Sequence, residues 1–367
     1  MSARLCATAL LASAKAVAGP VAMDDSRWNI NAQTYAVSNI DGVQALYLDA
    51  GTAELGGVNL KNGIIEFDLM NDGSRGFCGI YFRVTGPGSG ENFYLRPHQS
   101  GNPDANQYTP LFNGIGAWQL YFGSGYSAPL SYPRNQWIHL KLVLKDGQAD
   151  IYVDSDQPVL HVANLKQAHE AGAMVLGTNF APAYFANFSY QATDEVEIVG
   201  QAAPTAPAPP GIISEWRVSV PFAAGELVGD SIPAGIESAP WRALAVEDWG
   251  FANLSRVHPR SDQADTVIAE VTIRSDRDQT RLVQFGYSDR VKVYLNDQLL
   301  YVGNNQYQSR DYRYLGTIGL FDALPLTLKA GENRLRLAVS EAFGGWGVAA
   351  ALADREGLQI EAKAKPP

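Results

Sequence analysis

Apolar and polar residues alternate along much of this chain with a period of two. In the first half, the alternating stretches are residues 63–70, 93–96, 137–144 and 149–154. Successive side chains of a strand point to opposite faces, so this period indicates strands with one buried face. Asp146 and Gly147 lie between the last two stretches, and an Asp-Gly pair in this position predicts a hairpin.

The second half carries the same pattern in residues 267–275, 280–285, 290–296 and 333–340. Asn296 and Asp297 predict a turn, because both residue types tolerate positive φ. Many short strands with polar turns and almost no helical periodicity are typical of sandwiches. We therefore predict an all-β fold of two β-sandwich (jelly-roll) domains.

A segment rich in Pro and Ala divides the chain. Residues 201–211 read QAAPTAPAPPG, with four Pro in eleven residues and no charged side chain. Such a sequence favours extended, semi-rigid conformations and is typical of a spacer. We expect one domain over residues 24–197, a linker over residues 198–212 and a second domain over residues 213–361.

The N-terminal residues have the features of a targeting segment. Arg4 precedes an apolar stretch at residues 5–14, and Ala16 and Ala18 form an A-x-A pattern before Gly19. This arrangement predicts a signal peptide over residues 1–18, and hence a secreted or periplasmic protein. The alternative is an uncleaved tail that is helical or disordered.

Composition and charge narrow the function classes. The 367 residues are 46% hydrophobic and include 28 Lys and Arg against 38 Asp and Glu, a net charge of −10. An acidic chain without a basic run is a poor nucleic-acid binder, and no stretch is long and apolar enough to span a membrane. Two Cys exclude a disulfide framework, and no His or Cys spacing fits a transition metal. We expect no cofactor. A structural calcium ion stays open, although nothing in the sequence indicates it.

The first half also resembles a known family. The stretches GIIEFDLM, GIYFRV, FYLRPHQSGNPDANQYTPLFNG, WQLYFG, QWIHLKLVLKDGQADIYVD and YFANFSY resemble a concanavalin A-like (laminin-G-like) jelly roll. They are similar to bacterial domains of the 3-keto-disaccharide hydrolase type, and the resemblance covers most of residues 28–190. It implies chemistry on glycosides by hydrolysis or elimination, although a fold alone does not fix a function.

The second half resembles a different sugar-related module. The stretches VKVYLNDQLLY and LTLKAGENRLRLAVSEAFGGWGVAAAL are similar to the galactose-binding-like jelly roll that precedes the catalytic domain of family 2 glycoside hydrolases. The resemblance covers about residues 213–353, and no catalytic barrel follows it in this sequence. It implies a sugar-binding module without the catalytic machinery of that family.

Glu66 and Asp68 resemble part of the E-x-D-x-E motif of family 16 glycoside hydrolases. The position of the third carboxylate is occupied by Met70. A glycosidase that lacks one carboxylate of its pair lacks either its nucleophile or its acid. We therefore expect Glu66 and Asp68 to lie on the solvated face of a strand.

Residues 93–98 and their surroundings contain a group of candidate site residues that fits sugar binding better than Glu66 and Asp68 do. Strand alternation places Tyr94, Arg96 and His98 opposite Phe93 and Leu95. Aromatic rings stack on sugar faces, and forked donors hold hydroxyl pairs or a carboxylate. In an enzyme, His98 would be the general base and Arg96 the cation. The candidate ligand-binding residues are Arg83, Tyr94, Arg96, His98, Gln107, Asn113, Trp118 and Tyr121. The alternative is a structural network below a long loop.

Two polar and aromatic loops of the second half supply further candidates. Tyr307 and Arg310 lie in one, and Trp346 lies among glycines in the other. The glycines would leave the chain free to present the indole at the tip of the loop for sugar stacking. The alternative is that Trp346 packs on the neighbouring sheet or on the first domain.

These observations favour a secreted or periplasmic carbohydrate-binding protein, whose partner is an oligosaccharide or polysaccharide. Two alternatives stay open. The first is a glycoside-cleaving enzyme, by hydrolysis or elimination, that uses a cleft at Arg96 and His98. The second is an adhesion or scaffold protein, which predicts an exposed apolar patch instead of a cleft.

Overall fold

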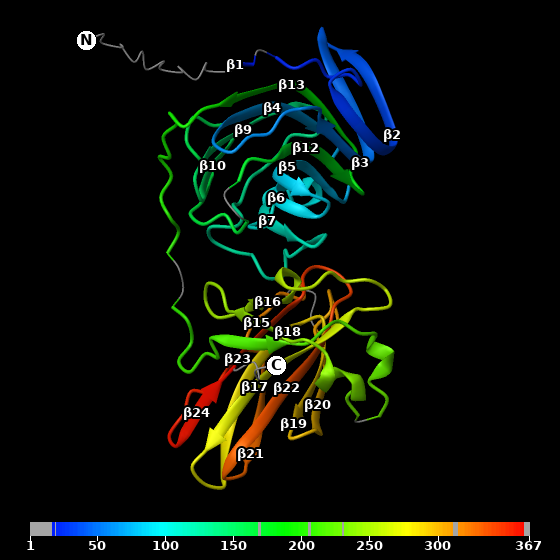
Figure 1. The fold of residues 1–367 in the computed structure, drawn as a ribbon. Coiled ribbons are helices and arrows are strands. Elements are labelled where there is room, and N and C mark those ends of the chain that lie inside the picture. Colours follow the sequence, from blue (N-terminus) through cyan, green and yellow to red (C-terminus); the bar gives the residue numbers. More distant parts are fainter. Residues whose placement is uncertain are drawn as a thin grey trace, which may run out of the picture.

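The computed structural model describes residues 17–18, 20–167, 170–204, 207–229, 231–310 and 315–362. The expected signal peptide lies outside these residues except for Val17 and Ala18. The chain forms two β-rich lobes, one above the other in Figure 1. We call residues 20–197 the first lobe and residues 213–362 the second lobe.

The first lobe is built on one curled, antiparallel sheet with the order β11-β10-β9-β4-β13-β3-β12-β5-β6-β7-β8. Two further strands pair at its margin, β1 with β13 and β2 with β3. The strands are β1 (Val17–Ala18), β2 (Trp28–Ile40), β3 (Val43–Leu55), β4 (Gly63–Asn71), β5 (Phe77–Gly86), β6 (Ser89–Leu95), β7 (Asn106–Phe112), β8 (Ile115–Gly116), β9 (Trp137–Lys145), β10 (Gln148–Val153), β11 (Leu160–Val162), β12 (Ala173–Asn179) and β13 (Ala183–Ala192). A 3-10 turn, η1 (Pro97–Gln99), follows β6.

Strand β3 turns this sheet into a sandwich. Its first part pairs with β13 over residues 45–48, and its second part pairs with β12 over residues 51–54. Ala50, with φ of 49°, lies between the two parts, where the strand passes from one layer to the other. Phe67 of β4, Phe82 of β5 and Phe93 of β6 meet in the core between the layers, and all three are fully buried.

The second lobe has two antiparallel sheets. The larger has the order β15-β14-β17-β22-β19-β20 with β24 beside β17, and the smaller has the order β16-β23-β18-β21. Its elements are β14 (Glu215–Val218), η2 (Ala224–Glu226), η3 (Ala234–Ser238), β15 (Arg242–Ala245), β16 (Ala252–Asn253), η4 (Leu254–Arg256), β17 (Thr266–Ser275), β18 (Gln279–Ser288), β19 (Arg290–Leu295), β20 (Gln298–Asn304), β21 (Asp322–Leu328), β22 (Gly331–Ser340), β23 (Gly347–Ala351) and β24 (Leu358–Glu361). Apolar side chains of both sheets form one core. The predicted all-β fold is confirmed.

The Pro-rich segment is held at both ends. Near its start, the Asp150 carboxylate of β10 accepts hydrogen bonds from the amides of Val199 and Gly200, at 2.7 and 2.9 Å. At its end, the carbonyl of Gly211 accepts a hydrogen bond from the amide of Leu352, at 2.8 Å. The described part of this segment runs down the side of the molecule as an extended chain (Figure 1).

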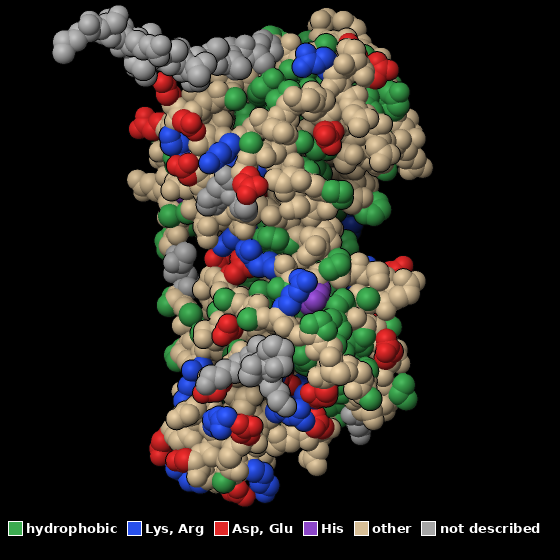
Figure 2. Space-filling model, viewed as in Figure 1, with side chains coloured by type: hydrophobic (Ala, Val, Ile, Leu, Met, Phe, Trp, Pro, Cys, Tyr) green, Lys and Arg blue, Asp and Glu red, His purple; other side chains and the backbone are tan. Residues whose placement is uncertain are grey.

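The two lobes touch through an apolar cluster. Ala117, Leu120 and Tyr121 of the first lobe pack with Phe251 and Ile318 of the second. The space-filling view shows the lobes in direct contact at a waist, with acidic and basic side chains interspersed over this face (Figure 2). Among the described residues, no helix has the length and apolar character needed to cross a membrane.

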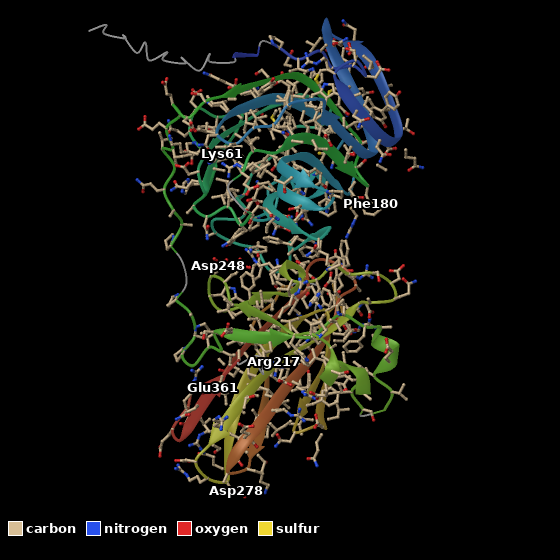
Figure 3. The ribbon with its side chains drawn as sticks, in the orientation of Figure 1. Lys61, Phe180, Arg217, Asp248, Asp278 and Glu361 are labelled. Carbon is tan, nitrogen blue, oxygen red and sulfur yellow. The ribbon has the colours of Figure 1, made fainter. Side chains whose placement is uncertain are left out.

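Polar bonds surround this cluster. Tyr121 Oη donates to the carboxylate of Glu247, at 3.0 Å from each oxygen. Ser288 Oγ donates to Gln119 Oε1 at 2.7 Å, and Lys166 Nζ donates to Asp248 Oδ1 at 2.7 Å. Figure 3 places Asp248 at the boundary between the lobes. These bonds hold the lobes in one orientation.

Candidate functional site

A groove lies at the boundary of the two lobes and contains two adjoining cavities. The first cavity, of about 340 Å³, lies over the outer face of β5, β6, β7 and β12. The second, of about 480 Å³, lies beside η1. Both are lined by Phe77, Trp118 and Phe343, so they are neighbouring parts of one groove. Phe343 belongs to the second lobe, which therefore supplies one wall.

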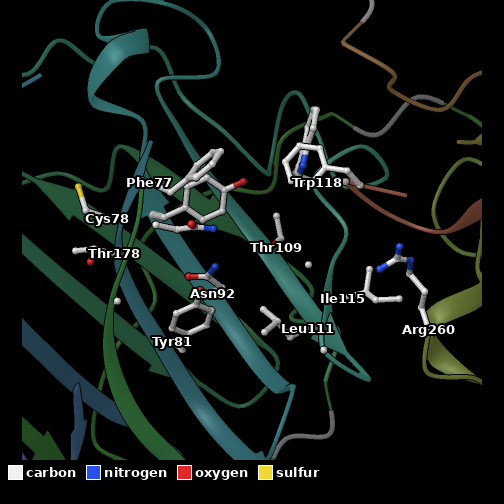
Figure 4. A pocket seen from close by; sticks show the side chains of 18 of the residues that line it. Phe77, Cys78, Tyr81, Asn92, Thr109, Leu111, Ile115, Trp118, Thr178 and Arg260 are labelled. Atoms are coloured by element: carbon white, nitrogen blue, oxygen red, sulfur yellow. The ribbon is translucent and has the colours of Figure 1, made fainter. Parts of the chain in front are cut away.

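Strand alternation explains the floor of the first cavity. Ile80 of β5 and Phe93 of β6 point into the sandwich core and are fully buried. Tyr81 and Asn92, their neighbours along the chain, therefore face the opposite side and line the cavity. Figure 4 shows these two side chains on neighbouring strands, with Trp118 at one end and Arg260 of the second lobe across the cavity.

Aromatic rings from both lobes form the junction between the cavities. Trp118 contacts Phe343 edge to face, with ring centroids 5.9 Å apart, and contacts Tyr307 at 6.1 Å. Phe343 is 50% exposed and Phe180, which lines the second cavity, is 71% exposed. Figure 3 shows Phe180 at the edge of the first lobe. Exposed rings beside a cavity are available to a ligand.

Arg96 is a buried cation at the base of the second cavity. Its guanidinium carbon lies 5.7 Å from the ring centre of Phe77, 5.3 Å from that of Tyr94 and 5.7 Å from that of Trp118. Nη2 donates to Tyr94 Oη at 3.2 Å and to Gln107, while Nη1 donates to the Asp104 carbonyl at 3.0 Å. The three rings and these bonds fix the position of the charge.

His98 lies in the same cavity as a neutral imidazole. Its Nδ1 accepts a hydrogen bond from the amide of Gly76 at 3.3 Å. Partial burial lowers the pKa of His98 below its usual 6.5, and the charges of Arg75 and Arg96 lower it further. A neutral ring that accepts at Nδ1 carries its proton on Nε2, which is therefore a hydrogen-bond donor.

A buried carboxyl pair lies beneath the loop that carries Phe343. Glu341 is 2% exposed, and its Oε1 accepts a hydrogen bond from the amide of Gly345 at 3.1 Å. Asp289 Oδ2 accepts hydrogen bonds from the amides of Ala342 and Phe343, both at 2.8 Å. Burial, and then the charge of Asp289, raises the pKa of Glu341 to about 8. The pair shapes the loop, and Glu341 holds a proton at neutral pH.

The groove continues along the sheet beyond the first cavity. A third cavity, of about 540 Å³, is lined by Tyr81 and Leu111, which also line the first. Its far end is bounded by the turn between β5 and β6, residues 85–90. The three cavities thus follow one face of the first lobe from η1 to this turn.

The structure brings together five of the residues predicted from the sequence. Tyr94 and Trp118 line the first cavity, and Arg96, His98, Trp118 and Tyr307 line the second. Their proximity follows from the pairing of β6 with β5 and β7, and from the approach of the second lobe.

Arg83 and Gln107 do not line the described cavities. Arg83 is 1% exposed and donates to the carbonyls of Lys61 and Asp146, at 2.8 and 2.7 Å. Regular alternation along β5 would place Arg83 on the same face as Tyr81, but Arg83 has a φ of 51° at a bulge in β5, which breaks the alternation. Gln107 is buried behind Arg96 and donates to the carbonyl of Trp118 at 2.9 Å, so it supports the site from below.

Asn113 and Tyr121 connect the lobes and line none of the three described cavities. Asn113 Nδ2 donates to the carbonyl of Ser255 at 2.7 Å. Tyr121 is fully buried against the second lobe, and burial together with the Glu247 charge raises its pKa well above 10. Both residues therefore contribute to the interface between the lobes, and ligand binding by either one stays a prediction.

Trp346 and Arg310 also lie away from the groove. Trp346 is fully buried in the core of the second lobe, and its Nε1 donates to the Val339 carbonyl at 3.0 Å. The prediction that its indole stands at a loop tip is wrong. Arg310 is held by Asp322, through Nη2 and Oδ2 at 2.5 Å, and lines none of the described cavities.

The glycines beside Trp346 have a different use. A side chain at Gly345, which has a φ of 139°, would come within 2.9 Å of the Ala117 backbone. At Gly344, with a φ of 107°, it would come within 2.5 Å of Gln119. The glycines therefore let the second lobe approach the first closely, instead of freeing the loop.

Several residues of the groove were not predicted from the sequence. They are Arg75, Phe77, Phe180, Arg260, Glu341 and Phe343. None lies in a recognisable motif, and three of them come from the second lobe. The sequence signal that could have drawn attention to Phe343 is its place within the glycine-rich loop already noted for Trp346.

Glu66 and Asp68 lie on the outer, half-exposed face of β4, while Ile65 and Phe67 point into the core. Asp68 Oδ1 contacts His139 Nδ1 at 2.7 Å. Figure 1 shows β4 in the part of the first lobe that lies away from the second lobe. These carboxylates therefore do not belong to the groove.

No family model matches the chain, and no curated protein matches it. Among solved structures, carbohydrate-binding module CBM66 from Bacillus subtilis aligns with a TM-score of 0.36 and 17% identity, over 45% of this chain and 95% of its own. A β-glucanase of Bacillus licheniformis aligns with a TM-score of 0.35 and 12% identity, over 46% and 94%. A protein of unknown function with a galectin-like fold from Bacillus subtilis aligns with a TM-score of 0.33 and 11% identity, over 48% and 97%.

Proposed function

We propose that this protein binds a carbohydrate chain in the groove between its lobes. The observation that carries the proposal is the junction at Trp118, Phe343 and Tyr307, where rings from both lobes border two cavities. Aromatic rings offer flat apolar surfaces to the C–H faces of a sugar. The nearby Arg, His, Asn and Thr side chains supply the donors and acceptors that orient its hydroxyl groups.

The shape of the groove supports an oligosaccharide in preference to a single sugar. Each cavity is within the range of about 300–1,000 Å³ that small-molecule sites occupy. Neighbouring cavities share residues, so one extended ligand can fill them in sequence along the sheet. A chain of several sugar units fits this arrangement, and its affinity should rise with length until the groove is filled.

A glycan array followed by calorimetric titration tests the proposal. The wild-type protein is screened first, and the best oligosaccharide is titrated into two variants. Phe343→Ala removes a ring from the groove, whereas Phe321→Ala removes a ring of similar exposure, 52%, that does not line the cavities. We expect Phe343→Ala to lose about 1–2 kcal/mol of binding free energy and Phe321→Ala to bind as the wild type does.

Two outcomes would contradict the proposal. The first is that no glycan binds at any length. The second is that both variants bind the best oligosaccharide as tightly as the wild type. A product assay with the same oligosaccharide tests the cleaving alternative, for which His98 and Arg96 line a common cavity.

We further propose that the second lobe is a galactose-binding-like module and that the protein is exported. The resemblance of its late strands and the A-x-A pattern at residues 16–18 support these two proposals. Determination of the mature N-terminus of the protein isolated from its native cell tests export. An N-terminus at Met1 in a cytoplasmic fraction would contradict it.

A further inference from the structure

The second cavity has a net positive charge and several hydrogen-bond donors. Its described lining contains Arg75, Arg96 and His98, and one carboxylate, that of Asp104. Asp104 Oδ2 lies 3.6 Å from Arg96 Nη1, so the two charges offset each other. Among the described lining residues, this leaves the Arg75 charge without an acidic partner, in a protein whose net charge is −10.

The donors of this cavity are only partly used. The exposed Arg75 guanidinium donates through Nη2 to Tyr307 Oη at 2.8 Å. Within the described part of the chain, its Nε and Nη1 have no hydrogen-bond partner, and neither does His98 Nε2. Because His98 accepts at Nδ1, its Nε2 carries a proton. The cavity therefore offers unpaired guanidinium N–H groups and an imidazole N–H together.

This set of groups matches an oxyanion better than a hydroxyl group. Guanidinium pairs with carboxylate or sulfate through two parallel hydrogen bonds, and charge-assisted bonds of this kind are stronger than neutral ones. The rings of Phe77 and Trp118 flank the buried guanidinium of Arg96, which adds a second, less hydrated positive charge behind these donors. A neutral sugar would leave the Arg75 charge unmatched.

We propose that Arg75 and His98, backed by Arg96, bind an oxyanion substituent of the glycan, a carboxylate or a sulfate ester. The proposal rests on the function inferred above and specifies its ligand class as an acidic glycan. Tyr307 of the second lobe orients Arg75, so the lobe that completes the groove also positions the cation.

Matched pairs of ligands test this proposal by calorimetric titration at low and high salt. Oligogalacturonate is compared with its methyl ester, and dextran sulfate oligosaccharide with dextran. The variants are Arg75→Gln and, as a control, Arg277→Gln, an exposed arginine of the second lobe whose partners are Asp276 and Glu356. Thermal melting of each variant verifies the fold.

We expect at least one charged ligand to bind about tenfold more tightly than its uncharged counterpart, with the difference reduced by salt. Arg75→Gln should abolish the difference, and Arg277→Gln should retain it. A difference in affinity between oligogalacturonate and its methyl ester would identify the bound anion as a carboxylate, and one between dextran sulfate oligosaccharide and dextran would identify it as a sulfate.

Equal binding of charged and uncharged ligands, or a preference that survives Arg75→Gln, would overturn the oxyanion site. If uncharged glycans bind and Phe343→Ala weakens them, the proposed function stands while the oxyanion site fails. If no glycan, charged or uncharged, binds in these titrations or on the glycan array, both proposals fail.

Discussion

Trp118 of the first lobe and Phe343 of the second meet edge to face, with ring centroids 5.9 Å apart, where two cavities join. One ring comes from the segment after β8, and the other from the loop between β22 and β23. Neither lobe alone forms the groove. Ligand binding therefore depends on the packing that fixes the lobes relative to each other.

Gly345→Ala is expected to loosen this packing. The new methyl group would lie within about 3 Å of Ala117 and Leu120, at a backbone conformation that disfavours side chains. We expect a loss of roughly 1–3 kcal/mol in the free energy of unfolding. Hydrogen exchange at residues 117–121 should accelerate. Gly225→Ala, where a methyl group meets nothing within 4 Å, serves as the control and should change neither quantity.

Trp346→Ala is expected to destabilise the second lobe by about 3–5 kcal/mol, because it empties a fully buried site and removes a hydrogen bond to the Val339 carbonyl. Urea unfolding measures the loss. Under conditions where the variant is folded, its glycan affinity should equal that of the wild type. A stable variant with weakened glycan binding would instead mean that the indole reaches the groove.

The buried carboxyl of Glu341 predicts a pH dependence of stability. Its pKa rises from the usual 4.5 to about 8 in the folded protein, so the folded state keeps a proton that the unfolded state releases. The free energy of unfolding should therefore fall between about pH 4.5 and pH 8, by up to about 1.4 kcal/mol per pH unit, and level off above pH 8.

Glu341→Gln tests this dependence, because the amide does not ionise. Urea unfolding at pH 5, 6.5 and 8 should show a smaller decline for the variant than for the wild type. Identical declines for the two proteins would show that Glu341 is not the group responsible. Burial also raises the pKa of Asp289. We therefore expect Asp289 to cause part of the fall in the free energy of unfolding that remains in Glu341→Gln.

Arg75 and His98 should be coupled electrostatically. The charge of Arg75 contributes to the lowered pKa of His98, so Arg75→Gln is expected to raise that pKa toward 6.5. NMR titration of the imidazole protons measures the change, and His98→Gln assigns the resonance. A His98 pKa that does not move in Arg75→Gln would place the two groups farther apart than the structure has them.

Strand alternation predicted the fold class well, because the period of two follows directly from one buried face. It failed at Arg83, where a bulge in β5 reverses the expected orientation. A bulge depends on pairing with the neighbouring strands, so a single strand sequence does not indicate it.

The candidate site was predicted in part. Tyr94, Arg96 and His98 lie within one short stretch, so local pattern was enough to group them. Phe343 and Arg75 were not predicted as site residues, because their place in the groove depends on contacts between residues far apart in the chain. For the same reason, the sequence around Trp346 was compatible with a free loop as well as with a packed indole, whereas in the structure Gly345 packs closely against Ala117.

The crystal structure of the protein with its tightest-binding oligosaccharide tests the central claim most directly. We predict that the sugar chain lies between the lobes, with one ring stacked on Phe343 or Trp118 and contacts to both lobes. A sugar chain bound instead on the outer face of β4, around Glu66 and Asp68, with the groove between the lobes empty, would contradict the account.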